Sequence, residues 1–124
     1  MDILSIILQI LLALMFLIAG LGKLFGSKTS VESFNHLKLA QWFRVITGLV
    51  ELIGAVGLII GFWEESWIPA GGLLLGVVAI GGIISHIRVK DSFKQTFTIL
   101  LLGIIAFVLL WINYSDLSSF PGFN

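Results

Sequence analysis

The chain contains no cysteine, so it can form no disulfide and can offer no thiolate as a nucleophile or as a ligand to a metal ion or an iron–sulfur cluster. Charge is also scarce, because Lys, Arg, Asp and Glu make up only 11% of the 124 residues and the formal net charge is zero. A neutral chain has no overall basic field that would attract nucleic acid, and we expect no nucleic-acid partner. Any redox role would need an electron carrier that the side chains do not supply.

The motifs of soluble enzymes are absent as well. The glycines lie in apolar runs rather than in strand-to-helix turns, so the sequence has neither a phosphate-binding loop nor a dinucleotide fingerprint. Of the two histidines, only His86 lies next to a long apolar run, which argues against a haem held by two histidines of one chain. We therefore expect no intrinsic cofactor and no metal site, and the sequence identifies no catalytic residue.

Apolar residues are what the chain has in abundance. They make up 58% of the sequence, and the mean hydropathy is +1.11. No soluble domain of this size hides so much apolar surface, whereas a helix of roughly 20 apolar residues crosses a bilayer. Four runs have a suitable length: residues 3–23, 43–62, 67–87 and 96–112. The sequence predicts an all-α, integral membrane four-helix bundle of a single domain, surrounded by the lipid bilayer.

Two segments lie outside these runs. In residues 30–39, Val31, Phe34 and Leu37 recur at a helix-like interval, which predicts a short helix at the membrane surface. Thr29 precedes Glu32 by three residues, the spacing of a capping box. The polar tail, residues 113–124, is expected to have no regular structure.

Charged residues divide between the two ends of the predicted spans. The bases flank the first and third connections: Lys23, Lys28, Lys38, Arg44, Arg88, Lys90 and Lys94. The opposite side receives the acids Asp2, Glu64, Glu65 and Asp116. Because basic loops stay in the cytoplasm, we expect both termini on the outer side.

Glu51 is the most informative polar residue. It lies about eight residues into the second run, or roughly 12 Å below the boundary, and an ionisable group at that depth usually faces protein or a water-filled cavity. Helical side chains lean toward their helix N-terminus, so Glu51 leans toward Arg44, and Lys23 and His86 lean inward from the boundary. We predict a ligand-binding polar cluster of Lys23, Arg44, Glu51 and His86 that opens toward the cytoplasm.

Simpler roles remain open for the bases. Lys23 and Arg44 can mark the membrane boundary, and a cation at His86 suits a helix C-terminus. His36, in the surface segment, is expected to be a solvated loop histidine.

Polar and small residues within the spans are expected to serve helix contacts. Gln9, Thr47 and Ser85 are candidates for interhelical hydrogen bonds. Glycines at a spacing of four occur in the second and third runs, at Gly57/Gly61 and Gly72/Gly76. We expect these two helices to touch, and the alternative use of the same glycines is a homo-oligomer interface.

The order of two short motifs resembles the DoxX-like family of small four-helix membrane proteins. These are Ala19-Gly20-Leu21-Gly22-Lys23-Leu24 at the end of the first run and Gly48-Leu49-Val50-Glu51-Leu52-Ile53-Gly54 in the second. The resemblance implies a multi-pass protein of the bacterial inner membrane. It also implies a functionally mixed group, which includes a subunit of a thiosulfate:quinone oxidoreductase, partners of redox-stress complexes and distant relatives thought to act as membrane chaperones.

Three functions stay open at this point. The first is an accessory component of a membrane redox or stress system that binds a quinone-type ligand and joins a redox-enzyme partner without being catalytic itself. The second is a small dimeric proton-coupled transporter that uses Glu51, although the small multidrug exporters of similar size carry their glutamate in the first span. The third is a structural or chaperone-like protein whose polar cluster only holds the bundle together.

Overall fold

The computed structural model describes residues 3–121, and that part of the chain is entirely helical, without strands. Its elements are α1 (Ile3–Phe25), α2 (Lys28–His36), α3 (Gln41–Ile60), α4 (Trp67–Arg88), α5 (Phe93–Asn113) and a 3-10 helix, η1 (Tyr114–Ser119). Within the described residues, α1, α3, α4 and the segment that starts with α5 are the four helices long and apolar enough to cross a membrane. The predicted all-α, four-span architecture is confirmed.

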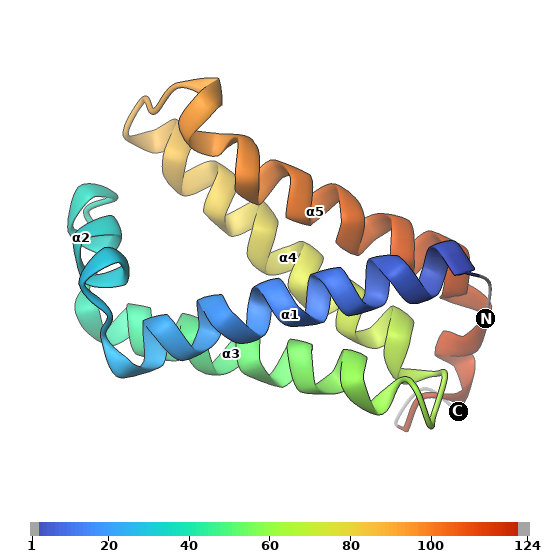
Figure 1. Ribbon diagram of the computed structural model, residues 1–124. Coiled ribbons are helices and arrows are strands. Elements are labelled where there is room, and N and C mark those ends of the chain that lie inside the picture. Colours follow the sequence, from blue (N-terminus) through green and yellow to red (C-terminus); the bar gives the residue numbers. More distant parts are fainter. Residues whose placement is uncertain (1–2, 122–124) are drawn as a thin grey trace.

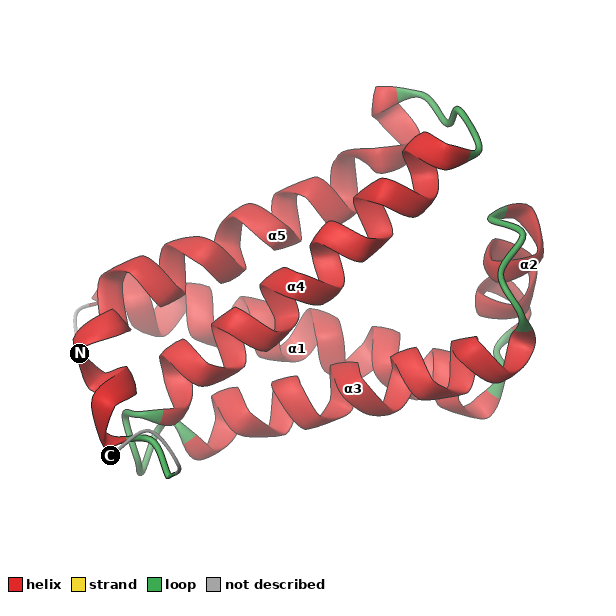
Figure 2. Cartoon of the chain, turned by 180° about the vertical axis from the view of Figure 1, so that it is seen from behind, coloured by secondary structure: helices red, strands yellow, loops and turns green. Residues whose placement is uncertain are grey.

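The long helices form two pairs, α1 with α3 and α4 with α5, and α3 also packs against α4. The pairs meet at the end that holds both termini and diverge toward the end that holds α2 and the α4–α5 connection (Figures 1 and 2). The core contains the fully buried side chains of Leu12, Phe16, Leu58, Ile68, Leu75 and Leu109. Much of the remaining apolar surface points outward, as expected for helices that face lipid.

Glycines set the distance between the helices. A methyl group on Gly48 of α3 would lie 2.8 Å from the main-chain oxygen of Gly20 in α1, and one on Gly54 would lie 2.5 Å from Leu75 of α4. Both helix contacts therefore depend on residues without a side chain. The predicted contact between the second and third spans is confirmed, since α3 packs on α4.

The glycines considered for a homo-oligomer interface are used inside the chain. Gly57 and Gly61 face the beginning of α4, and Gly72 and Gly76 face α5. All four residues are buried. They serve packing between neighbouring helices of one chain and do not lie on its outer surface.

The start of α2 differs from the prediction. The helix is capped by Ser27, whose hydroxyl accepts a hydrogen bond from the main-chain nitrogen of Ser30, so the capping box assigned to Thr29 and Glu32 is wrong. A serine two residues earlier satisfies the same free N–H groups of the first turn. The helix consequently covers residues 28–36 rather than 30–39.

The fourth span also begins earlier, and the tail is ordered further than expected. Ser92 and Gln95 form a capping box, which starts α5 at Phe93 instead of residue 96. After α5 the chain continues as η1, and the ring of Phe120 packs 5.0 Å from that of Trp67. The expectation of an irregular tail is wrong for these residues because apolar side chains dock it on the start of α4. The last residues of the tail, 122–124, lie outside the described part, as does Asp2.

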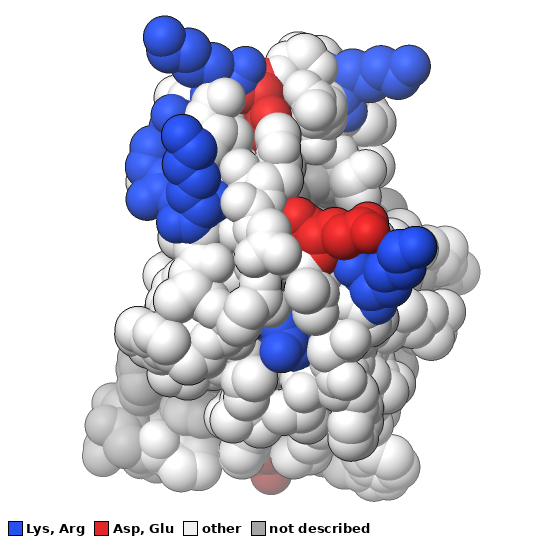
Figure 3. Space-filling model, turned by 90° about the vertical axis from the view of Figure 1, so that its left-hand side faces the viewer, with Lys and Arg blue, Asp and Glu red and all other residues white. Residues whose placement is uncertain are grey.

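Charges separate along the long axis of the bundle. The Lys and Arg residues belong to α2, to the ends of α1, α3, α4 and α5 beside it, and to their connections. Figure 3 looks onto this end, where the blue side chains gather. Glu64 and Glu65 lie in the α3–α4 connection at the other end. The outer placement of the termini stays a prediction, based on this asymmetry.

Candidate functional site

Glu51 of α3 pairs with Lys23 of α1. The distance between Lys23 Nζ and Glu51 Oε1 is 2.9 Å, and the side chains are 22% and 3% exposed. No other polar group of the described residues bonds Oε1, so the Lys23 ammonium is its partner. Close contact between α1 and α3 at Gly48 lets the Lys23 stem lie against α3, one turn from Glu51. The predicted inward lean of Lys23 produces this pair.

Arg44 lies outside the cluster that was predicted for it. Its guanidinium donates to the main-chain oxygen of Lys23 and, at 2.7 Å, to Oε1 of Gln41. The carbonyl groups of the last turn of a helix have no partner within the helix, and Arg44 satisfies one of them at the end of α1. The expectation that Glu51 leans toward Arg44 is wrong, because the lysine on the neighbouring helix takes the place of the arginine.

A cavity of about 560 Å³ lies beside the Lys23–Glu51 pair, between the diverging helix pairs and next to α2. Its apolar walls include Phe34, Leu37, Phe43, Ile46, Val50, Val77, Val78 and Ile99. Polar side chains in the same walls are Lys23, Ser33, Thr47, Glu51, Ser85 and His86. Ligand sites typically combine a mainly apolar surface with a few convergent polar groups, and this cavity has that composition.

Two hydroxyl groups in the walls, those of Thr47 and Ser85, donate within their own helices. Thr47 donates to the main-chain oxygen of Phe43 and Ser85 to that of Gly81, each at 2.8 Å. Thr47 and Ser85 therefore do not form the expected interhelical bonds, since each hydroxyl donates to the carbonyl one turn earlier in its own helix. Gln9 behaves as expected, since its Nε2 donates at 2.7 Å from α1 to a main-chain oxygen of α3.

His86 lines the cavity from α4, but its bonding partner is Asp91, which was not among the predicted site residues. Its Nδ1 lies 2.7 Å from Oδ2 of Asp91, and Nε2 of His36 lies 2.7 Å from the other carboxylate oxygen. His36 is thus a partner of Asp91 and not simply a solvated loop histidine. The hydrogen bond from His86, supported by the one from His36, holds the pKa of Asp91 below its ordinary value.

One signal in the sequence could have identified Asp91. It is an acid in a connection whose other charged residues, Arg88, Lys90 and Lys94, are all basic. An acid among bases at one end of the bundle has counter-charges available to it, and both histidines of the chain lie at that end.

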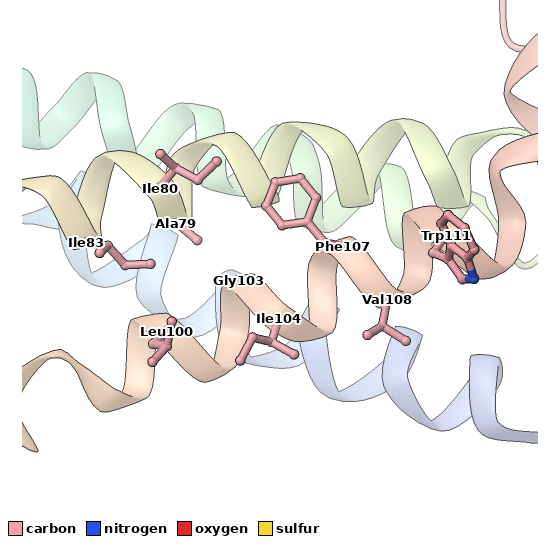
Figure 4. A pocket seen from close by; sticks show the side chains of 9 residues that line it. All are labelled: Ala79, Ile80, Ile83, Leu100, Gly103, Ile104, Phe107, Val108 and Trp111. Atoms are coloured by element: carbon pink, nitrogen blue, oxygen red, sulfur yellow. The ribbon is translucent and has the colours of Figure 1, made fainter. Parts of the chain in front are cut away.

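A second hollow, of about 370 Å³, lies between α4 and α5 (Figure 4). It is lined by Ala79, Ile80, Ile83, Leu100, Gly103, Ile104, Phe107, Val108 and Trp111. No acid or base is among these residues, and the indole N–H of Trp111 is the one polar side-chain group, so the hollow offers almost entirely apolar contact. Of these two hollows, only the cavity beside Glu51 combines apolar walls with ionised groups.

Comparison with known proteins agrees with this architecture. The model of the DoxX-like family matches residues 7–109. A protein of Bacillus subtilis (strain 168), the uncharacterized protein YdgD, is 26% identical over 112 residues, which cover 90% of this chain and 98% of the other. No solved structure matches the chain significantly. With a family match that spans most of its length and four helices that can cross a bilayer, the chain belongs to the DoxX-like family of multi-pass membrane proteins.

Proposed function

We propose that the cavity beside Lys23 and Glu51 binds an apolar molecule with a carbonyl-bearing head group, of the quinone type, and that the protein is an accessory component of a membrane redox system. The observation that carries the proposal is an ion pair in the wall of a cavity that is otherwise mainly apolar. Apolar walls accommodate a ring and a tail, and the polar groups orient the head group.

The placement of the ion pair favours binding over packing. Taking two charges out of water is costly, and apolar residues of similar volume often stabilise a fold equally well. Here both members of the pair line the cavity, although Glu51 itself is nearly inaccessible to solvent. Lys23 carries three N–H donors, so it can bind Glu51 and still donate to a ligand carbonyl. His86 binds Asp91 through Nδ1 and also lines the cavity, so its other ring nitrogen is not used for Asp91.

Access from the bilayer is consistent with the residues between α3 and α4. Ile46 and Val77 line the cavity and are 46% and 56% exposed. Gly81 also lines it, and a methyl group there would meet no atom within 4 Å. A hydrophobic ligand dissolved in lipid can therefore approach the ion pair between these two helices.

A thermal-unfolding experiment with detergent-purified protein tests the proposal. Menaquinone or ubiquinone analogues should raise the apparent stability, by about 2.7 kcal/mol at a concentration about 100 times Kd. We expect the rise to be smaller in Glu51→Gln, which removes the charge, and to be lost in Gly81→Phe, which fills the cavity. Gly81→Ala is the matched control, because its methyl group occupies open space and leaves room for a ligand.

The opposite result has a clear meaning. If no quinone stabilises the parent protein, or if both variants are stabilised as much as the parent, the cavity is not a quinone site. The transporter and structural hypotheses would then be preferred, and uptake of a cationic dye into liposomes along a proton gradient would separate them.

A further inference from the structure

Asp91 connects two parts of the bundle that otherwise diverge. It lies between α4 and α5, and it binds His36 at the end of α2 and His86 near the end of α4, each at 2.7 Å. Arg88 adds a second connection, because its guanidinium donates to the main-chain oxygens of Leu37 and Lys38. These contacts join α2 to the α4–α5 connection at the open end of the bundle (Figure 1).

The helix that is held in this way forms part of the cavity. The cavity walls include Ser33 and Phe34 of α2 and Leu37, the residue that follows the helix. Phe34 is only 5% exposed and Leu37 only 6%. Residues with positive φ stand on both sides of α2, Gly26 at 72° and Lys38 at 58°. The chain therefore turns sharply before and after a short helix, which is the arrangement of a segment that can move as a unit.

We propose that α2 is a lid over the cavity, that the bridge His36–Asp91–His86 is its latch, and that protonation of the two histidines closes the latch. The Asp91 side chain is only 4% exposed, so its carboxylate needs counter-charges. Imidazolium groups supply them, and charge-assisted hydrogen bonds are about twice as strong as neutral ones. When the histidines are neutral, the Asp91 carboxylate is held only by neutral N–H donors at these two contacts. Water then solvates the carboxylate better than the histidines do, and the lid opens.

Other charged groups at this corner do not replace the histidines as sensors. The bases there are Lys23 of α1, Lys28 of α2, Lys38 just after it, Arg44 of α3, Arg88 of α4, Lys90 of the connection and Lys94 of α5. Lysine and arginine side chains ordinarily keep their charge between about pH 5 and 8, the range in which histidine changes its own. Of the acids, Glu51 is paired with Lys23, and Glu32 lies on the exposed part of α2.

Asp91 itself limits the latch only at a much lower pH. Its pKa is lowered, chiefly by the hydrogen bond from His86, so the carboxylate stays ionised throughout the histidine range. A group with a lowered pKa contributes its full stabilisation of the closed lid at a pH above its ordinary pKa, and this stabilisation is lost as the pH falls through the lowered pKa. The lid should therefore be closed at mildly acidic pH and released toward alkaline pH.

The lack of cysteine makes a distance measurement direct. Spin labels on Glu32→Cys in α2 and Lys94→Cys in α5, both exposed positions, would report the distance between the lid and the start of α5 in lipid nanodiscs. We expect one short, narrow distance distribution at about pH 5.5 and a longer, broader one at about pH 8.5. In an Asp91→Asn background this pH dependence should disappear, and His36→Gln or His86→Gln should reduce it.

A second labelled pair controls for the integrity of the fold. Glu65→Cys and Ser119→Cys are exposed and belong to the opposite end, so their distance should not depend on pH in either background. The proposal is overturned if the lid distance is the same at both pH values, if the lid opens on acidification, or if the response persists in Asp91→Asn while the control pair is unchanged.

The latch controls access to the same cavity as the proposed function, but the distance experiment contains no ligand. A pH-dependent lid without any quinone effect on thermal stability would leave the latch standing and remove the ligand assignment. Quinone binding with a pH-independent lid distance would support the ligand assignment and remove the latch.

Discussion

Replacing Lys23 with methionine should destabilise the protein by leaving Glu51 without its counter-charge. Methionine keeps most of the apolar stem of lysine and removes the ammonium group. The Glu51 side chain is only 3% exposed, and among the described residues Lys23 is the group that compensates its Oε1. The variant therefore tests whether the ion pair is a necessary part of the bundle.

The size of the effect follows from the burial of the two side chains. Breaking a buried ion pair by removing one partner costs about 3 to 5 kcal/mol. Lys23 retains 22% exposure, and a stranded carboxyl group can relieve the cost by taking up a proton, so we expect about 2 to 3 kcal/mol. The double variant Lys23→Met with Glu51→Leu removes both charges and should lie within about 1 kcal/mol of the parent.

An SDS titration in lipid–detergent micelles, followed by circular dichroism, measures these differences. Glu51→Leu alone completes a double-mutant cycle, in which we expect a coupling energy of about 2 kcal/mol. If Lys23→Met unfolds at the same SDS concentration as the parent, or if the two substitutions are simply additive, Glu51 does not depend on Lys23 and the site has been assigned incorrectly.

Two further predictions concern helix packing and use the same titration. Gly48→Ala should destabilise the protein by about 1 to 3 kcal/mol, because its methyl group would meet the rigid main chain of Gly20 at 2.8 Å. The control Gly81→Ala has no neighbour within 4 Å and should be neutral or slightly stabilising. Equal effects of the two substitutions would mean that α1 and α3 are not in close contact. Gln9→Leu should lower the free energy of unfolding by about 1 to 3 kcal/mol, since the main-chain oxygen of Leu58 loses its buried hydrogen-bond donor from α1. A decrease below about 0.5 kcal/mol would show that this oxygen finds another donor.

The topology of the chain could be predicted without the structure. Its apolar runs leave no alternative to membrane-spanning helices, because each backbone polar group in lipid must be bonded within its own segment. Glu51 stands out for a related reason, since a carboxylate so far from the nearest boundary needs a partner or a cavity. Both deductions depend on position along the chain alone.

The identity of that partner could not be predicted. Glu51 leans toward the end of the bundle at which both Arg44 and Lys23 lie, and the choice between them depends on how α1 is rotated against α3. Gly20 and Gly48 set that rotation by letting the two main chains touch, which brings Lys23 to the carboxylate and leaves Arg44 at the end of α1.

The latch depended even more on tertiary structure. His36 and Asp91 are separated by 55 positions, and nothing in the local pattern around either residue indicates the other. In a soluble protein the apolar face of each helix would show which residues point inward. Here the lipid-facing and core-facing surfaces are both apolar, so hydrophobicity marks the spans but not their rotation. The sequence by itself determined that the chain crosses the membrane and where a charge is buried, whereas close packing at glycines and long-range polar pairs decided which side chains meet.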